Sequence, residues 1–150
     1  MERTAAVADT EKITINLGAV DLGKIDLLVD QGLYSTRADL IRTAIRHQLD
    51  CHADVVQQTV SRREMVVGVL VLGKKELESR RARGEKLRVG VVGMFTLSSD
   101  VDEDLAREVI ESIDLFGSFR ASAAVKQALA GRVRQFATLY RGSSDEGRTS

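Results

Sequence analysis

Residues 11 to 49 read EKITINLGAVDLGKIDLLVDQGLYSTRADLIRTAIRHQL, and this stretch decides the fold of the amino-terminal part. Polar side chains at Lys12, Thr14 and Asn16 alternate with apolar ones at residues 13, 15 and 17. Alternation with a period of two is typical of a strand with one buried side and one side that faces solvent. We therefore predict a short strand over residues 12 to 17.

Two short helices are predicted after this strand. Apolar residues take helical spacing from residue 20 onward, with Asp21 as a candidate N-cap and Gly32 as the stop. The second helix is expected to begin at Ser35 or Thr36, because Thr36 and Asp39 lie three apart in the manner of a shortened capping box. Its apolar stripe consists of Leu40, Ile41, Ala44, Ile45 and Leu49.

The predicted strand has no candidate partner before residue 65 of its own chain. A lone strand leaves backbone donors and acceptors unpaired along both of its edges. The simplest solution is a homodimer in which two copies of the strand pair antiparallel across a two-fold axis, with four helices packed beneath them.

This order of elements resembles the ribbon-helix-helix family of CopG, MetJ and Arc type repressors. The resemblance rests on the strand, the first helix, the turn Gly32-Leu33-Tyr34-Ser35 and the run YSTRADLIRTAI from Tyr34 to Ile45. It covers about a quarter of the chain.

The resemblance implies a regulator that binds double-stranded DNA by laying a two-stranded ribbon in the major groove. The side chains that contact bases would then be Lys12, Thr14 and Asn16. Lysine can donate to guanine, asparagine can form two hydrogen bonds with adenine, and threonine can contact a thymine methyl group. Judged by the strand pattern alone, the same residues could simply face water.

The resemblance also implies phosphate contacts at the start of the second helix, through the backbone amides of Ser35, Thr36 and Arg37. Free amides at a helix N-terminus and the positive end of the helix dipole attract anions. Arg42 and Arg46 lie a turn apart on the polar side of this helix and are expected to face solvent.

The charge of the chain does not by itself indicate a nucleic-acid partner. The chain has 22 Lys or Arg and 22 Asp or Glu, and residues 1 to 63 contain eight basic against nine acidic residues. Binding would therefore depend on where a few charges point, with modest affinity and a shallow salt dependence for each dimer. The basic residues between 74 and 88 are interleaved with glutamates, which favours a solvated helix with local ion pairs over a secondary DNA contact.

The expected location is the cytoplasm, in association with the nucleoid. No stretch approaches the roughly 18 apolar residues needed to cross a bilayer, so no membrane partner is predicted. The first ten residues lack an apolar signal core. The single cysteine, Cys51, excludes an internal disulfide and fits a reducing compartment.

The chain offers little material for catalysis or for a metal site. His47 and Cys51 are four apart on one helix face, with His52 adjacent, a spacing that can hold a metal. There is no further histidine, so we expect packing and surface groups and predict no metal. No nucleophile and base pair is apparent, and we predict no enzyme, no catalytic residue and no cofactor.

From residue 65 the sequence becomes rich in valine and glycine. Three segments align on their glycines: VGVLVL at 67–72, VGMFTL at 92–97 and FGSFRA at 116–121. Gly68, Gly93 and Gly117 are 25 and then 24 residues apart. Helical composition follows each segment, over residues 74–83, 101–111 and 123–134, with Ser99 or Asp100 and Ser122 as candidate caps.

Strand and helix units at this period require parallel strands joined by crossovers. The expected fold class is α+β: a ribbon-helix-helix dimerisation domain followed by a three-coil α/β solenoid or layered sheet. A βαββαβ sandwich, with residues 89–97 split into two strands at Gly93, is the alternative. Apolar spacing through Val133, Phe136, Leu139 and Tyr140 predicts that the last helix extends beyond residue 134.

The predicted domains are a disordered arm (1–10), the DNA-binding domain (11–50), a helical connector (51–64), the repeat region (65–141) and a polar tail (142–150). The connector is expected either to continue the second helix or to break near Asp50 and restart. Together these features predict a repressor-like transcriptional regulator whose repeat region associates dimers or senses a signal. The alternatives are the antitoxin of a toxin-antitoxin pair and a self-assembling scaffold anchored on DNA.

Overall fold

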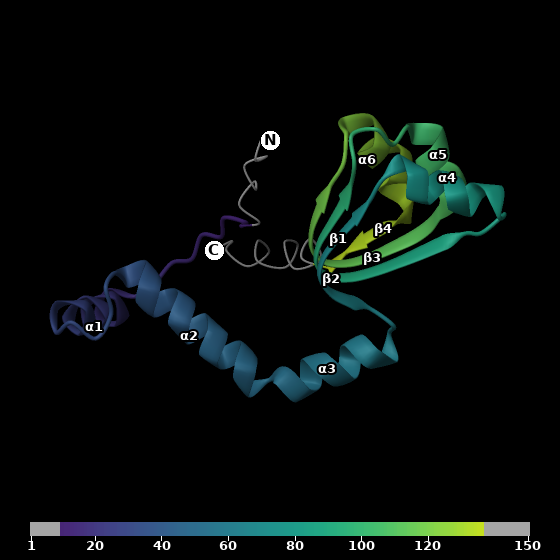
Figure 1. Ribbon diagram of the computed structural model, residues 1–150. Helices are drawn as coiled ribbons and strands as arrows, with labels where there is room; N and C mark the ends of the chain where they lie inside the picture. The colour runs from purple at the N-terminus through teal and green to yellow at the C-terminus, as the bar shows by residue number, and fades with distance from the viewer. Residues whose placement is uncertain (1–9, 137–150) are drawn as a thin grey trace, which may run out of the picture. The chain divides into compact units, whose positions relative to one another are not determined.

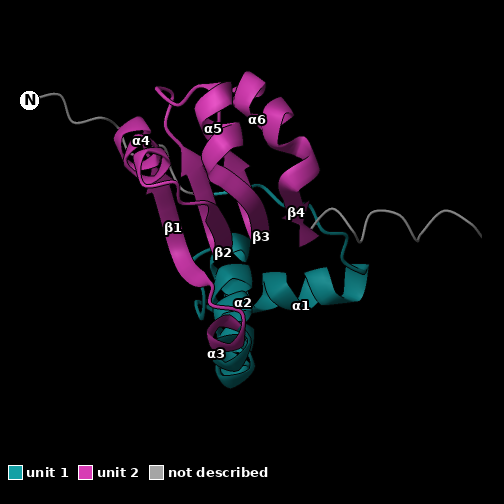
Figure 2. Cartoon of the chain, turned by 90° about the vertical axis from the view of Figure 1, so that its right-hand side faces the viewer, with its two compact units in different colours: residues 1–59 teal, residues 60–150 magenta. Residues whose placement is uncertain are grey.

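A computed structural model describes residues 10–136 of the chain. The chain divides into two compact units, residues 1–59 and 60–150, which are teal and magenta in Figure 2. The predicted tail and all but the last residue of the predicted arm lie outside the described residues. No helix in the described range is long and apolar enough to cross a membrane.

Three helices precede the sheet: α1 (Ala19–Asp30), α2 (Arg37–Cys51) and α3 (Ala53–Arg62). The prediction of Asp21 as the first N-cap is wrong, because Gly18 is extended (φ −63°, ψ 151°) and the helix begins directly after it. Asp21 lies in the first turn, where its charge complements the helix dipole. Gly32 adopts φ +77° and ends the helix as expected. Between α2 and α3 the helix breaks at His52 and restarts, close to the predicted break.

Residues 10 to 18 form no strand within the single chain, and all of them are exposed. A strand is defined by a partner strand, and the partner expected for residues 12 to 17 belongs to a second copy. The strand and the two-fold ribbon therefore stay predictions.

The carboxy-terminal unit is a four-stranded parallel sheet in the order β1-β2-β3-β4 with helices between the strands. Helices α4, α5 and α6 lie on one face of the sheet, as Figure 1 shows. The core between them contains Phe95 and Leu115 from the strands and Leu77, Leu105 and Leu129 from the helices. The elements are β1 (Val66–Leu72), α4 (Lys74–Ala82), β2 (Leu87–Leu97), α5 (Glu103–Val109), β3 (Ile110–Arg120), α6 (Ala123–Leu129), a 3-10 turn (Ala130–Arg132) and β4 (Val133–Gln135).

The parallel sheet agrees with the predicted alternation of strands and helices. β2 runs through Gly93 without the split that the βαββαβ alternative required.

Several expected helix ends are wrong. Asp102, not Ser99 or Asp100, caps α5, whereas Ser122 caps α6 as predicted. The last helix does not extend: it ends at Leu129, and residues 133–135 instead form a strand. The open edge of β3 supplies the physical reason, since hydrogen bonds to that edge are available to an extended chain and not to a helix.

The three aligned glycines lie side by side in the sheet. Gly68 of β1 is opposite Gly93 of β2, which is opposite Gly117 of β3. Gly93 adopts φ +138°, and a Cβ atom on it would lie 2.1 Å from the Gly68 carbonyl oxygen. Gly117 adopts φ +129°, and a Cβ atom on it would lie 1.9 Å from the Gly93 carbonyl oxygen. The neighbouring backbone therefore occupies the space that a side chain would need.

We expect Gly117→Ala to destabilise the chain by at least about 2 kcal/mol, because the substitution adds a backbone clash to a positive φ. Chemical denaturation of the full chain measures this loss. Gly68→Ala adds a side chain at φ +126° without a clash inside one chain, since nothing in the described chain lies within 4 Å of the position that a Cβ atom would take there. Gly131→Ala, in open space, is the control and should change the free energy of unfolding little. Equal effects at all three positions would contradict the close-packing argument.

Candidate nucleic-acid interface

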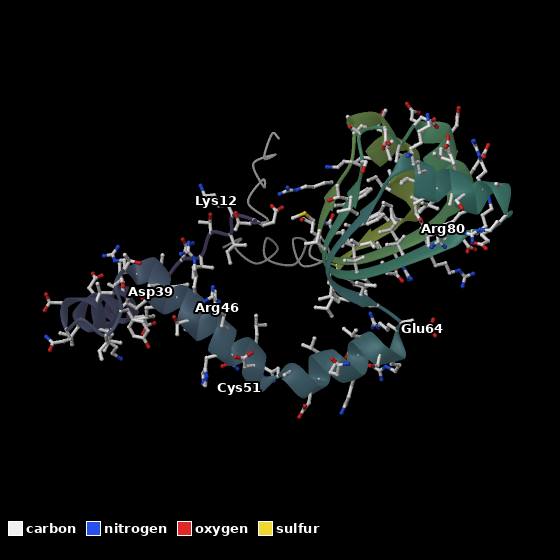
Figure 3. All side chains as sticks on the ribbon, viewed as in Figure 1. Lys12, Asp39, Arg46, Cys51, Glu64 and Arg80 are labelled. Carbon is white, nitrogen blue, oxygen red and sulfur yellow. The ribbon has the colours of Figure 1, made fainter. Side chains whose placement is uncertain are left out.

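The three predicted base-contacting residues lie in the segment that leads into α1. Lys12, Thr14 and Asn16 are all exposed, and Figure 3 labels Lys12 on this segment. The apolar residues between and after them are also exposed, at 74% for Ile13, 57% for Ile15 and 44% for Leu17. Because no described part of the chain covers this apolar side, one chain alone does not orient the three polar side chains.

The three helices before the sheet bury none of their residues. Their exposed apolar side chains extend from the first helix to the third: Val20, Leu27, Leu28, Ile45, Leu49, Val55 and Val56. Apolar surface of this extent on a small unit marks an interaction site. The unit therefore has the surface of a protein that completes its core with a partner.

Two hydrogen bonds hold the start of α2. The Asp39 N–H donates to Thr36 Oγ1 at 3.1 Å, and the Ser35 N–H donates to Asp39 Oδ2 at 3.0 Å. Thr36 therefore caps the helix, as predicted. The Asp39 carboxylate accepts from the amide of Ser35, one residue before the cap, whereas in a regular capping box it would accept from the amide of Thr36.

The same bonds distinguish among the amides predicted to contact phosphate. The Ser35 N–H is already bonded to the Asp39 carboxylate. Arg37 and Ala38, as the first two residues of the helix, have no acceptor for their N–H groups within it. Of the three amides predicted to contact phosphate, that of Ser35 is therefore occupied by the Asp39 carboxylate, whereas that of Arg37 has no acceptor within the helix.

The side chain of Arg37 is engaged with α1. Its Nε and Nη2 donate to the two carboxylate oxygens of Asp26 at 2.6 and 2.8 Å, a bidentate pair that ties the first helix to the second. The hydrogen bonds hold the pKa of Asp26 below its ordinary value and raise the pKa of Arg37. Both side chains are about half exposed, so the guanidinium remains accessible to an exchange of partners.

The other candidate binding groups on α2 are two exposed arginines and a histidine beside a cysteine. Arg42 and Arg46 are exposed, as predicted. His47 Nε2 lies 3.9 Å from Cys51 Sγ, so the structure brings the two together. Within residues 10–136, no cluster of three or more potential ligands could hold a metal ion.

The basic stretch that begins at Lys74 forms local ion pairs along α4, as expected. Arg80 Nε lies 3.1 Å from Glu76 Oε1, and Lys74 Nζ lies 4.0 Å from Glu78 Oε1. Both pairs are four residues apart, the spacing at which helical side chains meet. These cations are accordingly not concentrated for binding of an anion.

The carboxy-terminal unit also has a cavity of about 780 Å³ that the sequence did not reveal. Two bidentate ion pairs between neighbouring strands line it: Arg88 with Glu111 at 2.7 and 3.2 Å, and Arg134 with Asp114 at 2.7 and 3.0 Å. The pKa of Glu111 is lowered, chiefly by the hydrogen bonds from Arg88. Because these charges neutralise one another in pairs, they give the cavity little net charge with which to select a ligand. Only the strand register, which the sequence does not show directly, brings these residues together.

A family model described as Ribbon-Helix-Helix transcriptional regulator family matches residues 8–126, which is most of the chain. The match spans the predicted strand, all three helices before the sheet and the first three strands of the sheet. No curated protein and no solved structure matches the chain.

Thr36→Ala should lower the stability of the amino-terminal unit by about 1 kcal/mol, since loss of an N-cap side chain typically costs roughly 0.5–2 kcal/mol. Thermal unfolding followed by helical circular dichroism measures the change. Thr43→Ala, an exposed substitution in the middle of the same helix, is the matched control. It should leave stability unchanged or raise it slightly, since alanine is the better helix former. A control loss as large as that of Thr36→Ala would argue against the cap.

Proposed function

Because the chain belongs to the ribbon-helix-helix transcriptional regulator family, we propose that it is a repressor-like regulator that recognises specific DNA sequences without catalysis. The family model supports DNA binding and a dimer. The observation that carries the rest is the exposed alternation of Lys12, Thr14 and Asn16 with three uncovered apolar residues. A second copy can cover that apolar side and leave the polar side for the DNA.

In the proposed complex, two copies of residues 12 to 17 pair antiparallel and lie in the major groove. Lys12, Thr14 and Asn16 contact base edges, where each well-formed bidentate contact discriminates by about 1–3 kcal/mol. Two-fold symmetry of the protein then favours a partly palindromic site. Pairing also gives the backbone of both strands its missing hydrogen bonds.

The phosphate contacts in this proposal come from the start of α2, at Ser35, Thr36 and Arg37. The amide of Arg37 and the positive helix end are available for an anion. The Arg37 side chain would exchange Asp26 for a phosphate, since both are oxyanions that accept two hydrogen bonds from a guanidinium. The Ser35 amide would have to leave Asp39 first.

The carboxy-terminal unit serves in this proposal to associate copies of the chain, within a dimer or between dimers. Nearly balanced charge predicts weak binding by one dimer. Linked subunits that bind together gain affinity through their high effective concentration. Regulation at the nucleoid would then depend on both units.

The base contacts are tested by substituting Thr14 and Asn16 together with alanine. The DNA upstream of the protein's own gene serves as the candidate cognate site. We expect the double variant to lose its preference for this DNA over unrelated DNA of the same length, since the remaining phosphate contacts carry no sequence information. Titration of the purified protein against the two DNAs, at fixed salt, measures the ratio of affinities. The control Thr43→Ala with Gln48→Ala removes two exposed polar groups from α2 and should keep the preference. Retention of full preference by the Thr14 and Asn16 variant would refute the assignment.

The phosphate contact is tested through the pair of Arg37 and Asp26. Arg37→Ala should weaken binding to every DNA and reduce the slope of log affinity against log salt by about 0.9 for each chain. Asp26→Asn removes the competing carboxylate and should strengthen binding. Asp30→Asn makes the same change of charge on the same helix without touching the ion pair, so it should strengthen binding less. Equal gains from the two substitutions would show that only net charge matters.

A further inference from the structure

The first strand of the sheet has one edge that nothing in the described chain covers. β1 (Val66–Leu72) pairs with β2 and stands at the end of the strand order β1-β2-β3-β4. Its sequence, VVGVLVL, contains no charged residue and no proline. Val67, Val69 and Val71 are 60%, 51% and 56% exposed.

The opposite edge is quite different. β4 (Val133–Gln135) has three residues, with the exposed Arg134 in its middle. Short length and a charged side chain are the usual means by which a protein prevents another strand from pairing with an edge. β1 is longer and carries neither device, so one edge of this sheet is protected against pairing and the other is open to it.

The backbone groups on the open edge can be identified. The Leu72 carbonyl oxygen accepts a hydrogen bond from the N–H of Ser98, which follows β2, at 3.0 Å. Leu72 therefore directs its backbone groups toward β2. Because these groups alternate in direction along a strand, Val67, Val69 and Val71 direct their N–H and C=O groups outward.

We propose that β1 pairs antiparallel with β1 of a second copy of this chain, about a two-fold axis that passes beside Val69. In this register Val69 lies opposite the Val69 of the other copy, and Val67 lies opposite Val71. It is the register in which all three outward-facing residues of both strands pair with one another. The paired side chains are uncharged valines, which need no charged complement from a different protein.

The line along which the two β1 strands pair is called the seam here. Its length indicates which second copy of the chain supplies the other strand. A seven-residue strand is about 23 Å long at roughly 3.3 Å per residue. A seam of this length buries much less than the roughly 800 Å² per partner of a typical stable interface. The partner must therefore already be held nearby, and the other chain of the amino-terminal dimer meets this condition. The pairing in this respect rests on the proposed function, and it gives the association of the carboxy-terminal units a defined surface.

A cysteine placed on the axis tests the register in the full chain. Cys51→Ser removes the native thiol, and Val69→Cys is added to it. Mild oxidation with oxidised glutathione should produce a disulfide-linked pair of chains, since the Cα atoms of directly opposite residues lie about 5.5 Å apart, within the range of Cα distances that disulfides span. The yield should not change over a tenfold range of protein concentration if the two chains already belong to one dimer.

Val71→Cys in the same background is the matched control, because Val71 lies on the same strand with similar exposure. Two copies of residue 71 would be separated by about four residues along the paired strands, roughly 13 Å, which no disulfide spans. Circular dichroism confirms that both variants are folded. No linkage at residue 69, equal linkage at 69 and 71, or a yield that rises with concentration would each overturn the proposal.

Failure of this proposal can be distinguished from failure of the proposed function. If the chain with Val69→Cys does not link but still prefers its cognate DNA, the seam is refuted and DNA recognition stands. The Thr14→Ala and Asn16→Ala changes, placed in the Val69→Cys background, should abolish DNA preference and leave the linkage intact. Linkage that disappears with those two changes would contradict a seam formed by β1 itself.

Discussion

The constraint on which the amino-terminal unit depends is a set of apolar side chains that no part of residues 10–136 covers. Ile13, Ile15 and Leu17 are exposed ahead of α1, and no residue of the three helices is buried. Stability from burial is roughly proportional to the apolar area removed from water. A unit whose described residues bury so little apolar area would gain stability when a partner covers these side chains.

The carboxy-terminal unit, in contrast, buries a core of apolar side chains within one chain. Its core forms between the parallel strands and the helices α4, α5 and α6, all within one chain. Parallel strands need crossover helices, and these helices bring the apolar residues that cover one face. The sheet therefore has a core of its own within one chain. In the pairing proposed above, its association with a second copy would involve the edge strand β1 alone. One chain would then combine a unit whose apolar side chains await a partner with a unit whose edge strand can pair with one.

Local patterns in the sequence predicted the elements that local chemistry decides. The capping role of Thr36 and Asp39 and the helix stop at Gly32 depend on residues close together in the chain, and both are present. The three glycines were aligned by sequence and lie opposite one another in the sheet. The family match supports the resemblance seen in residues 11 to 49.

By contrast, the sequence does not predict β4, because its three residues form a strand only where β3 offers an edge. The cavity with Arg88 and Glu111 depends likewise on register between strands far apart in sequence. The residues that contact DNA remain predictions, since their positions depend on a second chain.

The row formed by Gly68, Gly93 and Gly117 has a consequence for how such a chain can evolve. Each of the last two glycines faces the carbonyl oxygen of the one before it at a distance that excludes even a methyl group. Insertion of a single residue within β2 or β3, ahead of its glycine, would move that glycine out of the row and bring a larger residue into its place. Differences in length among descendants of this sheet should therefore collect in the turns and helices between the strands. A sheet that grows by duplicating one strand and helix together avoids the difficulty, because the new strand brings its own glycine in step.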